Sequence, residues 1–189
     1  MENTDYKKYR WFLTSTGKLV IGGKNAEQND ELLRKVQKSR EDLIVMHTFS
    51  PGSPFSVILS SINNITKEDL EECAIFTACF SKAWKDKKKK EKVDIFRLSQ
   101  IKKTIGMKTG TWAVKGTVQK KEAPLKLSLT FQKEILRAVP EKSAKKKLLR
   151  ISPGNTDKLD LVPIIQKHIP NISREDILSA LPAGGIKIQ

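Results

Sequence analysis

The chain has 189 residues, of which 36 are lysine or arginine and 21 are aspartate or glutamate, so its formal net charge at pH 7 is +15. This length suits one domain with a small appendage, and the charge predicts a polyanionic partner such as nucleic acid, a ribosome or an anionic membrane surface. No apolar run approaches the ~20 residues that a membrane span needs. The polar start, Met1–Tyr6, lacks the apolar core of a signal peptide. We therefore expect a cytoplasmic protein with no membrane partner.

A hairpin opens the chain. Phe12–Thr14 and Leu19–Ile21 are short apolar runs on either side of Ser15–Gly17, which is a turn signal. The pair Gly22-Gly23 follows the second run. Because glycine has no Cβ, this corner predicts either a positive φ or a close approach to another surface.

A capped helix follows the glycine corner. Asn25 followed by Gln28 is a variant of the capping box, and apolar residues then recur at helical spacing, which predicts a helix over about Ala26–Lys38. Lys24, Asn25, Gln28 and Asn29 should therefore cluster at its N-terminus. Free backbone N–H groups at such an end favour anions such as phosphate.

The next elements enclose a loop of unusual composition. The apolar runs at 42–49 and 55–61 predict two strands, and the segment between them, Ser50–Pro54, contains two prolines and a glycine. Thr66 then predicts the start of a capped helix with one strong apolar face, which runs to about Trp84.

A block of lysines separates this helix from further strands. Lys85–Lys92 is a charge run, which predicts an exposed loop that is either simply solvated or part of a binding surface. Strands are predicted over 93–96, 111–118 and 125–131. Within the second of these, Gly116 suggests a bulge or a close backbone approach.

The C-terminal quarter changes in composition. Pro140–Lys147 is polar and basic and predicts a link or hairpin turn, and Leu148–Ile151 a short strand. Ser152–Asn155 reads as a turn, after which Asn155 or Thr156 should cap a helix over Asp157–His168. Ser173 predicts the start of a last short helix.

Together these elements predict an α+β fold. We expect a mostly antiparallel sheet packed with two main helices in residues 1–135, and a small C-terminal strand-and-helix extension of unknown role in residues 136–189. The sequence shows no internal repeat.

Several segments resemble one known family. The opening run to Gln28-Asn29 resembles the start of NFACT-R, the RNA-binding domain of the NFACT proteins, which act in ribosome-associated quality control. The likeness covers roughly residues 9–120. Further matching segments are the strand that ends at His47, the Pro-Gly-Ser loop Ser50–Phe55, the helix that ends in Ala83-Trp84, the segment Ser99–Thr104 and the strand Gly110–Gly116.

The resemblance implies a function. A stand-alone, archaeal-type NFACT-R member would bind RNA, either tRNA or rRNA, in translation or ribosome-associated quality control, with the ribosome as a further partner. The pattern departs at Phe49, which stands where the family often carries an acidic residue after the histidine.

Ten residues are candidates for the RNA contacts. We expect a helix-end cradle, directional hydrogen bonds from the neighbouring loop, and lysine charge on phosphates without sequence readout. The cradle residues are Lys24, Asn25, Gln28 and Asn29, the loop residues are His47, Ser50 and Ser53, and the charges are Lys102, Lys103 and Lys115.

Other functions have less support in the sequence. It contains no phosphate-loop pattern, no nucleophile elbow and no histidine or cysteine set at metal-ligand spacing. We therefore expect neither an enzyme nor a bound metal or cofactor. Two alternatives remain open, DNA binding by the same basic surface and a protein-interaction scaffold on the ribosome, because phosphate contacts alone do not separate RNA from DNA.

Overall fold

The computed structural model describes residues 5–39 and 41–189, so the first four residues of the polar start lie outside it. The fold is α+β with antiparallel strand pairings, as the sequence predicts. The main sheet has six strands in the order β1-β2-β4-β3-β5-β8. These strands are β1 (Arg10–Leu13), β2 (Leu19–Gly22), β3 (Ile44–Thr48), β4 (Ser56–Ile58), β5 (Lys90–Arg97) and β8 (Gln119–Pro124).

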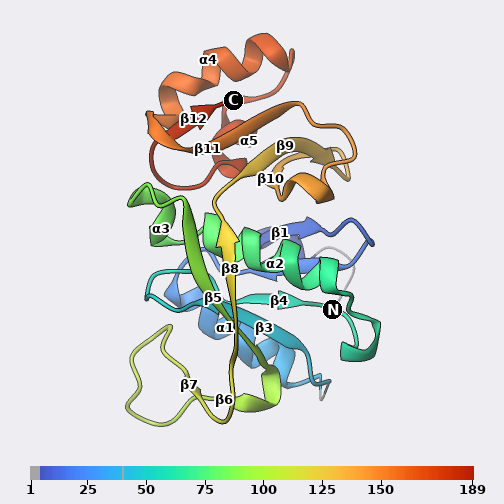
Figure 1. Ribbon diagram of the computed structural model, residues 1–189, viewed down its shortest axis with the longest axis vertical. Coiled ribbons are helices and arrows are strands. Elements are labelled where there is room, and N and C mark those ends of the chain that lie inside the picture. The colour runs from blue at the N-terminus through green and yellow to red at the C-terminus, as the bar shows by residue number, and fades with distance from the viewer. Residues whose placement is uncertain (1–4, 40) are drawn as a thin grey trace.

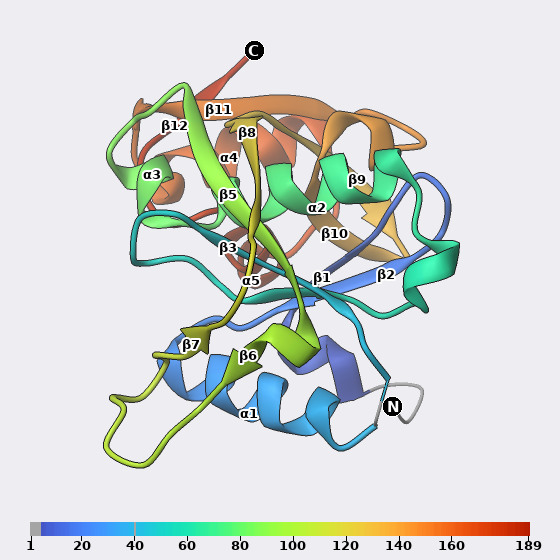
Figure 2. The same cartoon turned by 60° about the horizontal axis from the view of Figure 1, so that its bottom comes forward.

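Two helices cover the main sheet. Helix α1 (Ala26–Gln37) packs on one face and α2 (Lys67–Cys79) on the other (Figure 2). Successive strand side chains point to opposite faces, so neighbouring residues enter different cores. Val45 packs with α1, for example, while Met46 packs with α2. Both faces are apolar for this reason, and the sheet is a buried middle layer.

A second sheet lies on the far side of α2 (Figure 1). Its order is β10-β9-β11-β12, and two further helices, α4 (Lys158–His168) and α5 (Arg174–Ala180), pack with it. Its strands are β9 (Leu127–Gln132), β10 (Ile135–Val139), β11 (Leu149–Thr156) and β12 (Ile186–Ile188). The boundary between residues 135 and 136 stays a prediction. It falls inside β10, and β9, which precedes it, pairs with both β10 and β11.

The second sheet changes the environment of α2. The sequence predicts one apolar face on this helix, but its buried residues include side chains on nearly every side. Leu127 and Leu129 of β9 share a core with Cys73 and Phe76 of α2. The helix is enclosed because one sheet covers each side of it.

The helix predicted to reach Trp84 is in fact two helices. α2 ends at Cys79, and the four-residue α3 (Lys82–Lys85) starts anew. The break occurs because the Ser81 hydroxyl accepts a hydrogen bond from the Ala83 N–H at 3.1 Å and so caps the second helix. The apolar spacing runs through this break, which is why periodicity alone does not show it.

The lysine block was predicted to be an exposed loop, but its last three residues, Lys90–Lys92, belong to a strand. β5 begins at Lys90 and includes Glu91, whose side chain is buried and pairs with Lys88 at 2.6 Å. An edge of the block is thus folded into the sheet, with alternate residues pointing inward.

Other predicted bounds also change. The strand predicted over 111–118 is reduced to β7 (Ala113–Val114), which pairs with β6 (Ile101–Lys102). Gly116 lies beyond it with a φ of +81°, so the chain turns away there.

The C-terminal turn prediction is wrong. Ser152–Asn155 lies inside β11, and the chain does not turn there. Instead, the register of β11 with β12 shifts between Pro153 and Thr156, as at a β-bulge. Asp157, rather than Asn155 or Thr156, caps α4 by accepting a hydrogen bond from the Leu159 N–H at 2.8 Å. Across residues 5–39 and 41–189, no helix is long and apolar enough to span a bilayer.

Candidate nucleic-acid interface

An open groove of about 690 Å³ lies where segments far apart in the sequence meet. Its walls are the start of α1, the loop after β3, the helix α3 and the loop Thr109–Trp112. We call it the α1–α3 groove. Five of the ten predicted site residues line it, namely Lys24, Asn25, Asn29, His47 and Ser53.

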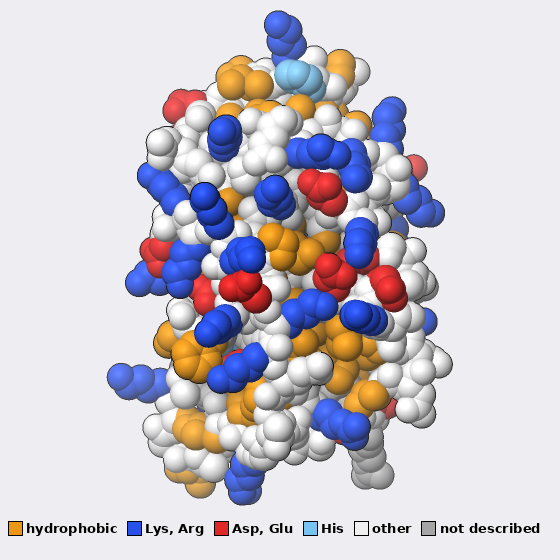
Figure 3. Space-filling view, viewed as in Figure 1, with side chains coloured by type: hydrophobic (Ala, Val, Ile, Leu, Met, Phe, Trp, Pro, Cys, Tyr) orange, Lys and Arg blue, Asp and Glu red, His pale blue; other side chains and the backbone are white. Residues whose placement is uncertain are grey.

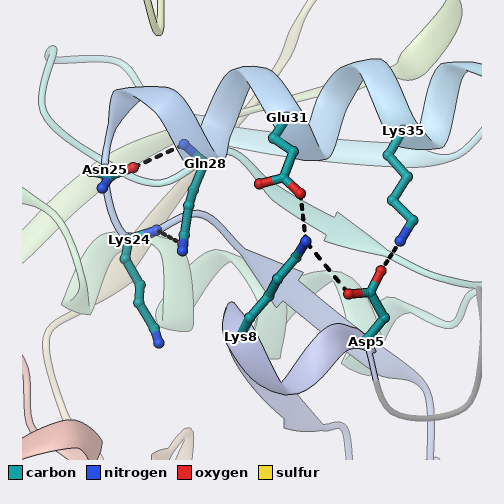
Figure 4. Close-up of polar contacts among 7 residues, drawn as sticks. All are labelled: Asp5, Lys8, Lys24, Asn25, Gln28, Glu31 and Lys35. Atoms are coloured by element: carbon teal, nitrogen blue, oxygen red, sulfur yellow. Dashed lines mark hydrogen bonds and ion pairs between the residues drawn. The ribbon is translucent and has the colours of Figure 1, made fainter.

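The start of α1 is fixed by its predicted cap. The Asn25 side chain accepts a hydrogen bond from the Gln28 N–H at 2.8 Å, and the Gln28 side chain accepts one from the Lys24 N–H at 3.0 Å (Figure 4). The variant capping box is therefore confirmed, although Gln28 reaches one residue further back than usual. Gln28 uses its amide oxygen here and does not line the groove.

Lys24 points away from this cap. Figure 4 shows its ammonium group directed away from α1, and none of the ion pairs among the described residues includes it, whereas Lys8 lies between Glu31 at 2.5 Å and Asp5 at 3.4 Å. Partial burial is the main cause that lowers the pKa of Lys24, and the charges of Arg10 and Arg137 lower it further. An exposed ammonium surrounded by other cations favours an anion.

The glycine corner is a close approach and not a left-handed turn. A Cβ on Gly23 would lie 2.3 Å from the Asn29 side-chain oxygen. That oxygen accepts a hydrogen bond from the Phe55 N–H at 3.0 Å, and the Asn29 amide donates to the Ser53 carbonyl at 3.5 Å. Asn29 is buried and joins α1 to the loop after β3, so its polar groups serve the shape of the groove.

The loop after β3 is held by its own hydroxyls. Ser53 accepts a hydrogen bond from the Thr48 N–H at 2.9 Å and donates to the Pro54 carbonyl at 3.1 Å. The Thr48 hydroxyl donates to the Ser50 carbonyl at 2.6 Å. Ser53 therefore faces the groove with its hydrogen bonds already made, while Ser50, half-buried, is not among the residues that line it.

His47 is a neutral hydrogen-bonding group. Its Nδ1 lies 2.7 Å from the Thr48 carbonyl oxygen, which only accepts, so Nδ1 carries the proton. Burial lowers the pKa of the ring, although the Thr48 contact and the nearby Asp94 carboxylate oppose this. The imidazole packs on Phe55 with centroids 4.5 Å apart. A neutral ring protonated at Nδ1 leaves Nε2 as an acceptor.

The three predicted lysines at the ends of β6 and β7 lie outside the groove, Lys102 as the last residue of β6, and Lys103 and Lys115 one residue beyond β6 and β7. Lys102 and Lys115 are exposed. Lys103 is mostly buried, and its ammonium contacts Asp30 at 2.5 Å and the Lys108 carbonyl at 3.0 Å. Asp30 also accepts hydrogen bonds from the Trp112 indole and the Gly110 N–H. Lys103 thus anchors a loop onto α1.

Sequence reasoning missed Arg10, Lys82 and Phe49 at the groove, and it considered Lys85 only as part of a lysine block that is either solvated or part of a binding surface. Arg10 stacks its guanidinium over the Phe80 ring at 4.6 Å, Lys82 and Lys85 come from α3, and Phe49 is 61% exposed. An arginine at the start of a buried strand and an apolar residue next to a Pro-Gly loop were the signals in the sequence. Both patterns are weak without the fold, because many surface positions share them.

The charge balance of the groove is basic. Among the described residues that line it, four are cations and one, Asp94, is an acid. The wider surface is less clear-cut. Figure 3 shows Lys and Arg side chains over the whole of one face, with Asp and Glu side chains set among them mainly across its middle. The net charge is therefore spread over the molecule, and the groove is one concave surface at which cations gather.

One protein family matches this sequence. The model of the family described as "NFACT protein RNA binding domain" matches residues 8–116. This range includes every predicted site residue, and of the described residues that line the groove it leaves out Ala183 alone.

A curated relative extends the similarity. The archaeal Rqc2 homolog aRqcH of Methanocaldococcus jannaschii is 29% identical over 97% of this chain, so most of the second sheet is included. The chain spans only 29% of the length of that relative.

A solved structure shares the fold. It is that of the C-terminal part of the fibronectin/fibrinogen-binding protein from Streptococcus suis, with a TM-score of 0.55 and 24% identity. It covers 61% of this chain, which in turn covers 45% of that one.

Proposed function

This chain belongs to the family of NFACT RNA-binding domains, and on that premise we propose that it binds structured RNA along the α1–α3 groove. The RNA is tRNA or rRNA, and the setting is ribosome-associated quality control in the cytoplasm; the similarity to the archaeal Rqc2 homolog supports this setting. The protein acts by binding and not as an enzyme.

The observation that carries the proposal is the set of cations around the groove. Arg10, Lys24, Lys82 and Lys85 come from β1, the start of α1 and α3, and one acid accompanies them among the described lining residues. Cations on phosphates release counterions, and this supplies affinity without base readout. A concave basic surface of this kind recognises the shape of a folded RNA.

The other residues at and around the groove have different roles in this proposal. Asn25, Gln28 and Asn29 hold the corner, and Ser53 holds the loop, since their polar atoms are engaged within the protein. Phe49 offers an exposed ring for an unpaired base. Lys102 and Lys115 extend the phosphate contacts beyond the groove.

His47 supplies a reason to prefer RNA over DNA. The 2′-hydroxyl is a donor that DNA lacks, and the free Nε2 of a neutral His47 is an acceptor in the groove. A site of this kind loses part of its affinity when the sugar is deoxyribose.

The main test is the salt dependence of tRNA binding in a filter-binding titration. The double variant Lys24→Glu/Lys85→Glu should bind at least about tenfold more weakly, with a log–log salt slope smaller by roughly 0.7–0.9 per lost contact. The matched control Lys126→Glu/Lys167→Glu removes the same charge at exposed positions away from the groove.

Three outcomes would contradict the proposal. Equal losses in both double variants would mean that net charge alone attracts the RNA. Equal competition by duplex DNA would contradict RNA preference and the role of His47. Retention of the protein on ribosomes after nuclease treatment would favour a protein-docking surface.

A further inference from the structure

A second, smaller hollow of about 190 Å³ adjoins the α1–α3 groove. Arg10, Lys24 and Phe80 line both hollows, so these three side chains stand where the two meet. The far wall of the second hollow comes from the second sheet and from α5, and includes Arg137 and Ser179.

Two arginines from different sheets are held on aromatic rings here. The Arg10 guanidinium lies 4.6 Å from the centre of the Phe80 ring, and that of Arg137 lies 4.3 Å from the centre of the Trp11 ring. Stacking of this kind fixes the plane of a guanidinium and leaves its N–H groups at the edge for an acceptor. Arg10 is on β1 and Arg137 on β10.

These cations have no acidic partner in the part of the chain that the structure describes. None of the ion pairs among residues 5–39 and 41–189 includes Arg10, Lys24 or Arg137. The Nε atom of Arg137 is buried with no hydrogen-bond partner. An unmet buried donor on a charged group is costly, so an acceptor is expected at this place.

The electrostatics of the three side chains agree. Desolvation, and then the charge of Arg10, lower the pKa of Arg137 to about 10. The Asp176 carboxylate on α5 raises the pKa of Arg137, but it forms no ion pair with this arginine. It already accepts a hydrogen bond from the Ser173 hydroxyl at 2.7 Å. Desolvation also lowers the pKa of Arg10. An anion placed among the three groups would relieve both their desolvation and their mutual repulsion.

We propose that Arg10, Lys24 and Arg137 together bind one phosphate of the RNA backbone, where the groove meets the second hollow. This inference rests on the proposed function. Guanidinium groups present paired N–H donors that match the two free oxygens of a phosphodiester, and a lysine adds a point charge. The groove leads the backbone to this place, because the two hollows share their wall.

The proposal gives the second sheet a role. Arg137 lies outside residues 8–116, which match the family, and its side chain reaches the cluster across the Trp11 ring of β1. The RNA-binding surface therefore includes both sheets, and a chain without the second sheet lacks one donor group of the phosphate site.

The test uses the full chain, a tRNA transcript and binding measured over a range of salt. Arg137→Gln should bind about tenfold more weakly, and its log–log salt slope should fall by about one. The control Lys167→Gln removes one exposed charge on α4 and should leave both quantities unchanged. Thermal melting and circular dichroism establish that each variant is folded.

A second variant covers the case in which loss of the Trp11 contact unfolds Arg137→Gln. Ser179→Glu keeps both arginines and places a carboxylate on the wall that they face. It should weaken RNA binding about as much as Arg137→Gln, while Ser179→Gln should bind like the unchanged chain.

The outcomes separate the two proposals. Loss of affinity in Arg137→Gln and Ser179→Glu, with both controls intact, supports the phosphate site. If both bind normally while Lys24→Glu/Lys85→Glu does not, the phosphate site is wrong and the groove proposal stands. If the unchanged chain binds no RNA, both are wrong. Stabilisation by inorganic phosphate that Arg137→Gln abolishes, with unchanged RNA affinity, would assign the site to a free anion and overturn the proposal.

Discussion

Lys103 and Arg137 are alike in burial and in having a tryptophan nearby, but the main charged neighbour of Lys103 is an acid and that of Arg137 is a base. Each is a cation, each is partly buried, and each lies near a tryptophan, with Lys103 at 5.6 Å from the Trp112 ring and Arg137 at 4.3 Å from the Trp11 ring. Lys103 meets the Asp30 carboxylate at 2.5 Å, whereas Arg137 meets the cation Arg10 and no ion-pair partner among the described residues.

The difference shows what decides whether a buried basic residue stabilises the fold or is free to bind a ligand. A desolvated cation needs a negative partner. At the Asp30 cluster, which comprises Asp30, Lys103, Gly110 and Trp112, the chain supplies that partner itself, and the result is an anchored loop. At the cluster of Arg10, Lys24 and Arg137, none of the ion pairs among the described residues supplies such a partner, and in our proposal a phosphate does. The comparison can be tested from both sides.

The largest effect is expected from Asp30→Ala. It leaves Lys103 buried without its partner and removes three hydrogen bonds, so we expect a loss of about 3 kcal/mol in the free energy of unfolding. Urea denaturation measures this. The control is Glu31→Gln on the same helix, which breaks an exposed pair and should cost less than about 1 kcal/mol. Similar losses in the two variants would show that the Asp30 cluster does not anchor the loop.

Single charge reversals at Lys24 and at Lys103 should have different effects, one on RNA affinity and the other on stability. Lys24→Glu should weaken RNA binding by at least ~1 kcal/mol and leave the unfolding free energy nearly unchanged. Lys103→Glu should do the reverse, because it sets a carboxylate against Asp30. Filter binding and denaturation on the same two variants give the comparison. A stable Lys103→Glu that binds RNA poorly would place Lys103 in the interface instead.

The stability that the Asp30 cluster contributes should be lost in acid. Burial favours the neutral form of Asp30, but the hydrogen bonds from Lys103, Trp112 and Gly110 outweigh it and hold the pKa below its ordinary value of 3.8. The carboxylate therefore contributes stability that is full above pH 3.8 and is lost as the pH falls through its lowered pKa. The difference in unfolding free energy between the unchanged chain and Asp30→Asn should be constant near neutral pH and shrink in acid. A constant difference down to the lowest pH would contradict this.

The smallest effect concerns His47. Burial lowers its pKa below 6.5, so the unfolded chain takes up a proton more readily than the folded one. Stability should then fall as the pH drops from 6.5 through the lowered pKa, and His47→Phe should remove that part of the decline. Thermal melts from pH 7.5 to pH 5 measure it. RNA affinity that rises on protonation of His47 would argue for a charged contact and against the proposed acceptor role.

The sequence predicted the local features of the fold and the family. The hairpin before Gly22, the cap at Asn25, the capping box at Thr66 and the cap at Ser173 all lie where the patterns indicate. Each depends on contacts between residues a few positions apart, so the sequence contains the whole signal.

The predictions were wrong where residues far apart in the sequence determine the secondary structure. The lysine block joins a strand and β8 was not predicted, because strand pairing selects these segments in spite of their polar composition. The short apolar strand β10 was not predicted either, and its place is set by pairing with β9. The helix predicted to reach Trp84 divides because Ser81 forms a new cap.

The candidate site divides in the same way. The sequence by itself determined the family, the α+β class, the basic charge and the corner that carries Lys24. Only the tertiary structure decided that Asp30 neutralises Lys103 and that Arg10 and Arg137, far apart along the chain, come together without a carboxylate. The physical reason is that caps and turns are set by neighbours along the chain, whereas the charge that a cation meets is set by packing across it.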